Sequence, residues 1–113
     1  MMRFLISFDD GAMSHISAED LPTVSDASHQ VVREAKEAGV WIFGGGVVSQ
    51  QASIVSTDGT VAAGPFPETK AVIGGFAVVE VQSREAALEW AARIAAACRC
   101  AQEVREIGYD PES

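Results

Sequence analysis

Short apolar runs alternate along this chain with two longer segments whose apolar residues recur at helical spacing. Runs rich in β-branched and aromatic residues, bounded by glycine, proline or polar residues, are typical of β-strands. Asp58-Gly59 lies between two of these runs and predicts a tight hairpin turn. The strands are predicted at residues 4–8, 40–43, 52–56, 60–62, 76–81 and 102–107.

The two helical segments each carry one apolar stripe. The first helix is predicted over residues 26–38, with a cap at Ser25, Asp26 or Ser28 and an end at Gly39. Its stripe consists of Ala27, Val31, Ala35 and Ala38, with Val32 at the edge. The second helix begins after Ser83, and its stripe consists of Ala87, Ala91, Ile94, Ala95 and Cys98.

The order of these elements predicts the fold. A strand, a helix, a strand, a two-stranded hairpin, a strand, a helix and a last strand give a ferredoxin-like α+β domain over residues 1–113. Such a domain has an antiparallel sheet with two helices on one face. Residues 9–28 form a long connection, which indicates either a functional lid or a short helical turn near residues 18–21. The glycines at 44–46 are predicted to interrupt the second strand as a bulge or a close backbone approach.

The predicted sheet is apolar on both faces. Residues 4–8 and 76–81 carry apolar side chains at successive positions, whereas a solvated face would alternate to polar residues. Two helices can cover only one of these faces. A second copy packing sheet against sheet would cover the other, so we expect a homodimer with a dimeric α+β barrel.

Composition and charge narrow the function classes. The chain has 113 residues and a net charge of −8, which disfavours nucleic acid and anionic membrane surfaces. No apolar run approaches the roughly 20 residues of a membrane-spanning helix, and the N-terminal residues lack a secretory signal pattern. A cytoplasmic protein is expected. Cys98 and Cys100 form a C-x-C pair without a second ligand pair, so reduced thiols are expected, with neither a metal nor a cofactor site.

Sequence motifs in the second half resemble those of a known family. GPFPETK at residues 64–70 is followed by GGFAVVEV, then EAALEWA, then EVR at residues 103–105. Their order and spacing resemble the DGPF branch of the YCII-related family. The chain departs from the family pattern at three positions: it has Ala63, Ala71 and Glu106 where the family has aspartate, glutamate and proline, respectively.

The resemblance implies a small-molecule-binding dimer and leaves open whether it is an enzyme. Some family members are proposed to use a histidine at the start of the first helix together with an aspartate as an acid–base pair, and one relative is a dehydrochlorinase. Cofactor-independent lyase or isomerase chemistry on a small organic substrate is therefore one hypothesis. The alternative is a non-catalytic ligand-binding or regulatory protein, since genes of this branch often lie near those of alternative sigma factors.

Three residues are candidates for catalysis: His29, His15 and Glu80. Histidine suits acid–base work because its side chain ionises near neutral pH. A helical wheel places His29 with Arg33 and Lys36, away from the apolar stripe, which favours a solvated position. His15 lies in the long connection and would reach a pocket only if that connection folds over. Glu80 interrupts an apolar strand and needs a partner.

The candidate binding residues are Phe66, Glu68, Lys70 and Arg105. The first three follow the rigid Gly-Pro turn, which we interpret as the rim of a small pocket. Lys70 could hold an anionic ligand. Arg105 shares a strand face with Glu103, which also fits a structural salt bridge. Arg105 or Lys70 is the expected partner of Glu80.

Overall fold

A computed structural model describes residues 1–68 and 72–113. Within them the chain forms two helices and six strands. In chain order these are β1 (Met2–Asp9), α1 (Leu21–Glu37), β2 (Trp41–Gly46), β3 (Ala52–Val55), β4 (Val61–Gly64), β5 (Ile73–Val81), α2 (Arg84–Cys98) and β6 (Glu103–Ile107).

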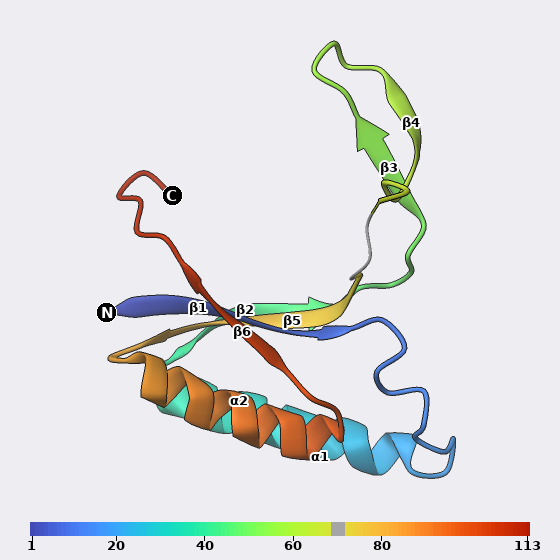
Figure 1. Ribbon diagram of the computed structural model, residues 1–113. Coiled ribbons are helices and arrows are strands. Elements are labelled where there is room, and N and C mark those ends of the chain that lie inside the picture. The colour runs from blue at the N-terminus through green and yellow to red at the C-terminus, as the bar shows by residue number, and fades with distance from the viewer. Residues whose placement is uncertain (69–71) are drawn as a thin grey trace.

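Four strands form one antiparallel sheet in the order β2-β5-β1-β6, so both central strands are those predicted as apolar on both faces. The two helices lie side by side under one face of this sheet, and the other face is open (Figure 1). This is the ferredoxin-like α+β arrangement, and the prediction of an antiparallel sheet with two helices on one face is confirmed.

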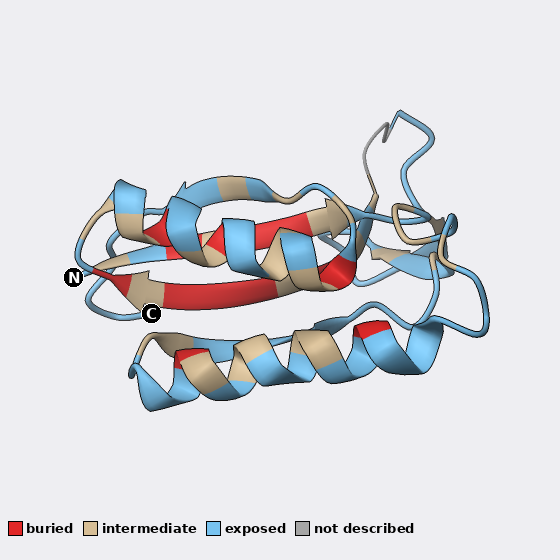
Figure 2. Cartoon of the chain, turned by 90° about the horizontal axis from the view of Figure 1, so that it is seen from below, coloured by how far each residue is buried: buried red, intermediate tan, exposed pale blue. Residues whose placement is uncertain are grey.

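The core lies between the sheet and the helices (Figure 2). Phe4 and Ile6 alternate toward the helices along β1, and Ala87 and Ala91 of α2 meet them from below. The buried side chains of β5 on this face are Ala77, Val79 and Val81. The predicted stripe of the second helix is therefore its buried face. Ser83 caps that helix by accepting a hydrogen bond from the Ala86 amide at 3.1 Å.

Helix α1 starts earlier than predicted. It begins at Leu21, not at residue 26, so the expected caps Ser25, Asp26 and Ser28 lie inside it. Pro22 occupies the first turn of this helix, where its missing amide proton costs no helical hydrogen bond. The short helical turn expected near residues 18–21 is therefore the approach to this helix.

Strand β2 continues through the glycines that were predicted to interrupt it. The expected close backbone approach is present: a Cβ on Gly44 would lie 2.5 Å from the carbonyl oxygen of Phe76. The bulge lies earlier, between Trp41 and Phe43. Because of it, Trp41 faces the helices while Phe43 lies on the open face.

The predicted hairpin forms, but outside the main sheet. Strands β3 and β4 make their own two-stranded sheet, which projects from the ends of β2 and β5 on the side away from the helices (Figure 1). Its turn contains Asp58 and Gly59, and Gly59 has a φ of +87°. Thr60 donates hydrogen bonds to the Asp58 carboxylate from its amide at 3.0 Å and its hydroxyl at 2.7 Å. These bonds lower the pKa of Asp58.

The open face of the sheet keeps an apolar centre. Phe43 and Phe76 meet edge to face, with ring centroids 5.4 Å apart, and Phe43 is 55% exposed. Val78 lies beside them and is buried. A second copy covering this face remains a prediction.

The helices in the described part of the chain are too short or too polar to cross a membrane.

Candidate small-molecule site

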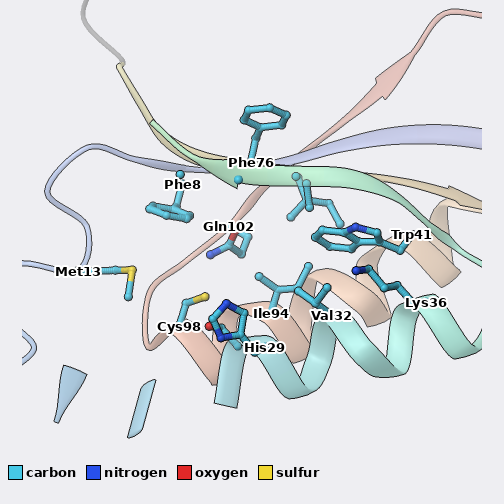
Figure 3. A pocket seen from close by; sticks show the side chains of 16 residues that line it. Phe8, Met13, His29, Val32, Lys36, Trp41, Phe76, Ile94, Cys98 and Gln102 are labelled. Atoms are coloured by element: carbon cyan, nitrogen blue, oxygen red, sulfur yellow. The ribbon is translucent and has the colours of Figure 1, made fainter. Parts of the chain in front are cut away.

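A cavity of about 400 Å³ lies between the sheet and the two helices. Strands β1, β2 and β5 line it from above and both helices from below. The connection after β1 closes one side through Met13 (Figure 3). This volume is within the range of small-ligand sites, which is about 300–1,000 Å³.

The walls of the cavity are mostly apolar. Phe8 and Trp41 project from the sheet toward the helices, and Val32 and Ile94 face them from α1 and α2 (Figure 3). Phe76 is also part of the lining, but its ring points to the open face of the sheet. A flat apolar molecule can therefore lie between the two aromatic side chains and the aliphatic ones.

Helix α1 supplies most of the polar groups. Ser28, His29 and Lys36 line the cavity together with Val32. Positions 28, 32 and 36 are four residues apart and share a helix face, and His29 lies next to this row. His29 is exposed, as the helical wheel predicts, and it also borders the cavity, which the wheel did not indicate. Its Nδ1 lies 3.5 Å from the Ser25 hydroxyl.

The remaining polar groups come from the end of α2 and from the segment that follows it. Gln102 points into the cavity, and Cys98, the last residue of α2, also lines it (Figure 3). Burial raises the pKa of the Cys98 thiol, and the neighbouring Cys100 adds to this rise. Burial also raises the pKa of the Cys100 thiol. Neither thiol is thus activated as a nucleophile.

The charge of the cavity is opposite to that of the chain. The sequence has 16 aspartate and glutamate residues and a net charge of −8. In the described ranges, none of these carboxylates lines the cavity, whereas Lys36 and His29 do. The same residues contain no cluster of three or more histidine, cysteine, aspartate or glutamate side chains that could hold a metal ion. The lining therefore favours a neutral or anionic organic ligand.

The second candidate histidine lies elsewhere. His15 is exposed in the turns after β1 and does not line the cavity, although Met13 of the same connection does. The connection between β1 and α1 therefore contributes the Met13 side chain to the cavity, and not a histidine.

Glu80 is charge-paired, as expected, but with a different partner. Its carboxylate accepts a hydrogen bond from Arg3 Nε at 2.8 Å, because Arg3 lies directly opposite on β1. The expected pairing with Arg105 is wrong, since Arg105 binds Glu103 at 2.8 Å. This second pair confirms the structural interpretation of Glu103 and Arg105. Lys70, the other expected partner, lies outside the described residues. Both ion pairs lie on the open face, not in the cavity.

The described residues of the segment interpreted as a pocket rim do not line the cavity either. Phe66 and Glu68 follow β4 and are exposed, and neither lines the cavity. Sequence reasoning missed Lys36, Trp41 and Gln102. The four-residue spacing of Ser28, Val32 and Lys36 could have indicated that they share one face of the helix. A face that mixes polar and apolar residues, however, looks the same in the sequence as a solvated face.

The chain belongs to the YCII-related domain family, whose model matches residues 2–108. A search of curated proteins found no match.

A solved structure with a similar fold covers nearly the whole chain. It is a 5-chloro-2-hydroxyhydroquinone dehydrochlorinase from Burkholderia phenoliruptrix AC1100, in complex with 2,5-dihydroxybenzoquinone. The two proteins share 13% sequence identity over 99% of this chain and 98% of the other, with a TM-score of 0.55. At this identity the likeness establishes the fold.

Proposed function

We propose that this YCII-related chain binds a compact aromatic anion in the cavity between the sheet and the helices. The observation that carries this proposal is the charge of the lining: a chain with net charge −8 offers Lys36 and His29 there, and none of its described carboxylates. A cationic ligand would find no counter-charge among these groups. An anionic one would be attracted by the Lys36 ammonium.

The shape of the cavity supports an aromatic ligand. Phe8 and Trp41 offer ring surfaces above, while Val32 and Ile94 offer aliphatic surface below. Aromatic rings stack or meet edge to face with a gain of about 0.5–1.5 kcal/mol beyond their buried area. The structurally similar dehydrochlorinase is described in complex with 2,5-dihydroxybenzoquinone, which is not aromatic but is also a compact, planar six-membered ring with acidic hydroxyl groups.

The test compares two variants of the same helix. Isothermal titration with 2,5-dihydroxybenzoquinone and with benzoate measures the affinity, and benzyl alcohol serves as the uncharged ring. Lys36→Gln should weaken binding of the two acids about tenfold to hundredfold, because a charge-assisted hydrogen bond contributes about 1.5–3 kcal/mol.

The control is Arg33→Gln, one turn earlier. Arg33 binds Gln30 and does not line the cavity, so its loss should leave the affinity unchanged. If Lys36→Gln and Arg33→Gln bind 2,5-dihydroxybenzoquinone and benzoate with equal affinity, the proposed anion site is refuted. Binding of benzyl alcohol should be the same in both.

A second candidate function is cofactor-independent acid–base catalysis, of lyase or isomerase type, by His29. The position of His29 at the cavity favours it. The expected carboxylate partner does not lie there among the described residues, and Nδ1 lies 3.5 Å from the Ser25 hydroxyl. His29 would therefore work without an orienting carboxylate and transfer a proton to or from a ligand held by Lys36.

Turnover separates this enzyme from a regulatory protein that only binds the ligand. With any substrate of the proposed class, His29→Gln should lower the rate about 10²–10⁴-fold and leave binding nearly intact. An unchanged rate would show that His29 is not the acid–base group, whereas a wild type that binds the ligand without turnover would leave the non-catalytic alternative, including a role linked to alternative sigma factors. His15→Gln is the control, because His15 lies away from the cavity.

The same proposal includes a homodimer through the open face of the sheet. Phe43, Phe76 and Val78 form its apolar centre. The exposed Arg3–Glu80 and Arg105–Glu103 pairs lie on the same face and carry no net charge. Such a surface is suited to a self-complementary contact, in which each subunit offers the same patch.

A further inference from the structure

In the described structure the hairpin arm, residues 47–66, is joined to β5 only near its base, where Val47 and Gln50 donate hydrogen bonds to the carbonyl oxygens of Gly74 and Ile73. Its strands β3 and β4 contact each other and no other helix or strand described here. Val55 and Val61 face each other across the hairpin and are 67% and 66% exposed. A two-stranded hairpin is at best marginally stable in water unless it packs against something else. The arm therefore needs a surface that the single chain does not provide.

The size of the molecule indicates how large that surface is. The chain exposes 7638 Å², whereas a compact monomer of 11.9 kDa exposes about 5,900 Å². Its radius of gyration is 15.8 Å, against about 13 Å for a compact domain of this length. The excess of about 1,700 Å² exceeds the roughly 800 Å² that each partner buries in a standard interface.

The arm projects on the side of the open sheet face. Figure 1 shows the arm rising from one end of the sheet and the C-terminal segment from the other, both away from the helices. The space above the sheet is thus flanked on two sides. The arm follows Gly46 of β2 directly, so it is continuous with the face that carries Phe43.

Charge indicates what occupies this space. The arm contains a single charged residue, Asp58, although 21% of the chain is charged. The ion pairs of the open face neutralise themselves. A highly charged partner would find no complementary groups on either surface. A second copy, despite its net charge of −8, can approach here without strong repulsion.

We propose that in the homodimer each hairpin arm lies across the partner subunit, with Val55 and Val61 packed against it. This inference rests on the homodimer of the proposed function and adds the arm as a second contact. Packing on the partner then supplies the surface that stabilises the hairpin.

The test places charges on the arm. Val55→Asp with Val61→Asp should weaken dimerisation at least 100-fold, measured by sedimentation over a range of protein concentrations. The control is Leu88→Asp on α2, an exposed apolar residue on the helical layer, which should leave the dimer unchanged. Far-ultraviolet circular dichroism should show both variants folded, because all three side chains are exposed.

Hydrogen exchange gives a second readout that needs no substitution. The amides of 52–55 and 61–64 should be protected in concentrated protein and exchange rapidly after dilution below the dissociation constant. Fast exchange in the intact dimer, or a double variant that dimerises like the wild type, would overturn the arm contact.

A sheet-face variant keeps the two proposals distinguishable. If Phe43→Asp dissociates the dimer and the arm variant does not, the homodimer stands and the arm contact fails. If the wild type is monomeric at every concentration, both fail. Ligand binding is measured independently by titration.

Discussion

At the scale of single residues, the thiol of Cys98 shows how the cavity selects its chemistry. Cys98 is 8% exposed, lies at the end of α2 and lines the cavity together with His29. Burial raises its pKa because a thiolate is poorly solvated there, and a charge on Cys100 would disfavour it further. The thiol therefore stays neutral at physiological pH. Proton transfer and charge in the cavity are left to His29 and Lys36.

This gives a prediction for reactivity and pH. In a Cys100→Ser variant, Cys98 should react with iodoacetamide far more slowly in the folded than in the unfolded protein at pH 7–8. The folded-state pKa is raised above the ordinary 9.0, so the protonated thiol favours folding. Its contribution is complete below pH 9.0 and is lost as the pH rises through the folded-state value.

The comparison is with Cys98→Ala. The melting temperature of the protein with Cys98 should fall more steeply above pH 9 than that of the alanine variant. Alkylation of folded Cys98 at the rate of a free thiol, or parallel melting curves, would contradict this assignment.

Residue roles were predictable in part, and register explains the difference. The position of Glu80 in an apolar strand correctly indicated an ion pair, because a partly buried carboxylate needs a partner. The partner depends on which residues face each other across β1 and β5, and sequence does not fix that register. In the register that the two strands adopt, Arg3 lies directly opposite Glu80. Likewise, His29 lies at the cavity because of how α1 sits against the sheet.

At the scale of elements, β2 is shaped by one close contact. Gly44 leaves no room for a side chain: a Cβ would lie 2.5 Å from Phe76 O and 3.0 Å from Ala77 Cα. The adjacent Gly45 has nothing within 4 Å of such an atom. Both glycines line the cavity, so substituting each in turn tests whether the glycines of β2 are needed for the close backbone contact.

Gly44→Ala should destabilise the fold by about 1–3 kcal/mol, since backbone atoms must shift to admit the methyl group. Gly45→Ala should be neutral or stabilising by up to about 1 kcal/mol, because alanine restricts the unfolded chain. Chemical denaturation measures both. Equal stability of the two variants would show that the close approach does not constrain β2.

Element types were predictable, whereas the start of α1 and the place of the hairpin were not. The polar residues before position 26 gave no helical stripe, yet α1 begins at Leu21 with Pro22 in its first turn, a position that tolerates proline. The Asp58-Gly59 turn predicted the hairpin correctly from local chemistry. That β3 and β4 leave the main sheet depends on tertiary packing, which no local pattern encodes.

At the scale of the whole molecule, the two-faced sheet remains the strongest indication of assembly. The helices bury Phe4, Ile6 and Val79, while Phe43 is left 55% exposed on the opposite face. This uncovered apolar face was predictable from the sequence, because residues 4–8 and 76–81 do not alternate between apolar and polar side chains. It could not predict how much surface the arm adds.

The last prediction concerns this assembly. At micromolar concentration, light scattering should give twice the 11.9 kDa mass of the chain. The melting temperature should rise with protein concentration, because association stabilises the folded state by mass action. Phe43→Asp should remove that dependence, and Leu88→Asp on the helical layer should keep it. A single species of the chain mass, with a melting temperature independent of concentration, would contradict the homodimer, and the open face would then need a different partner.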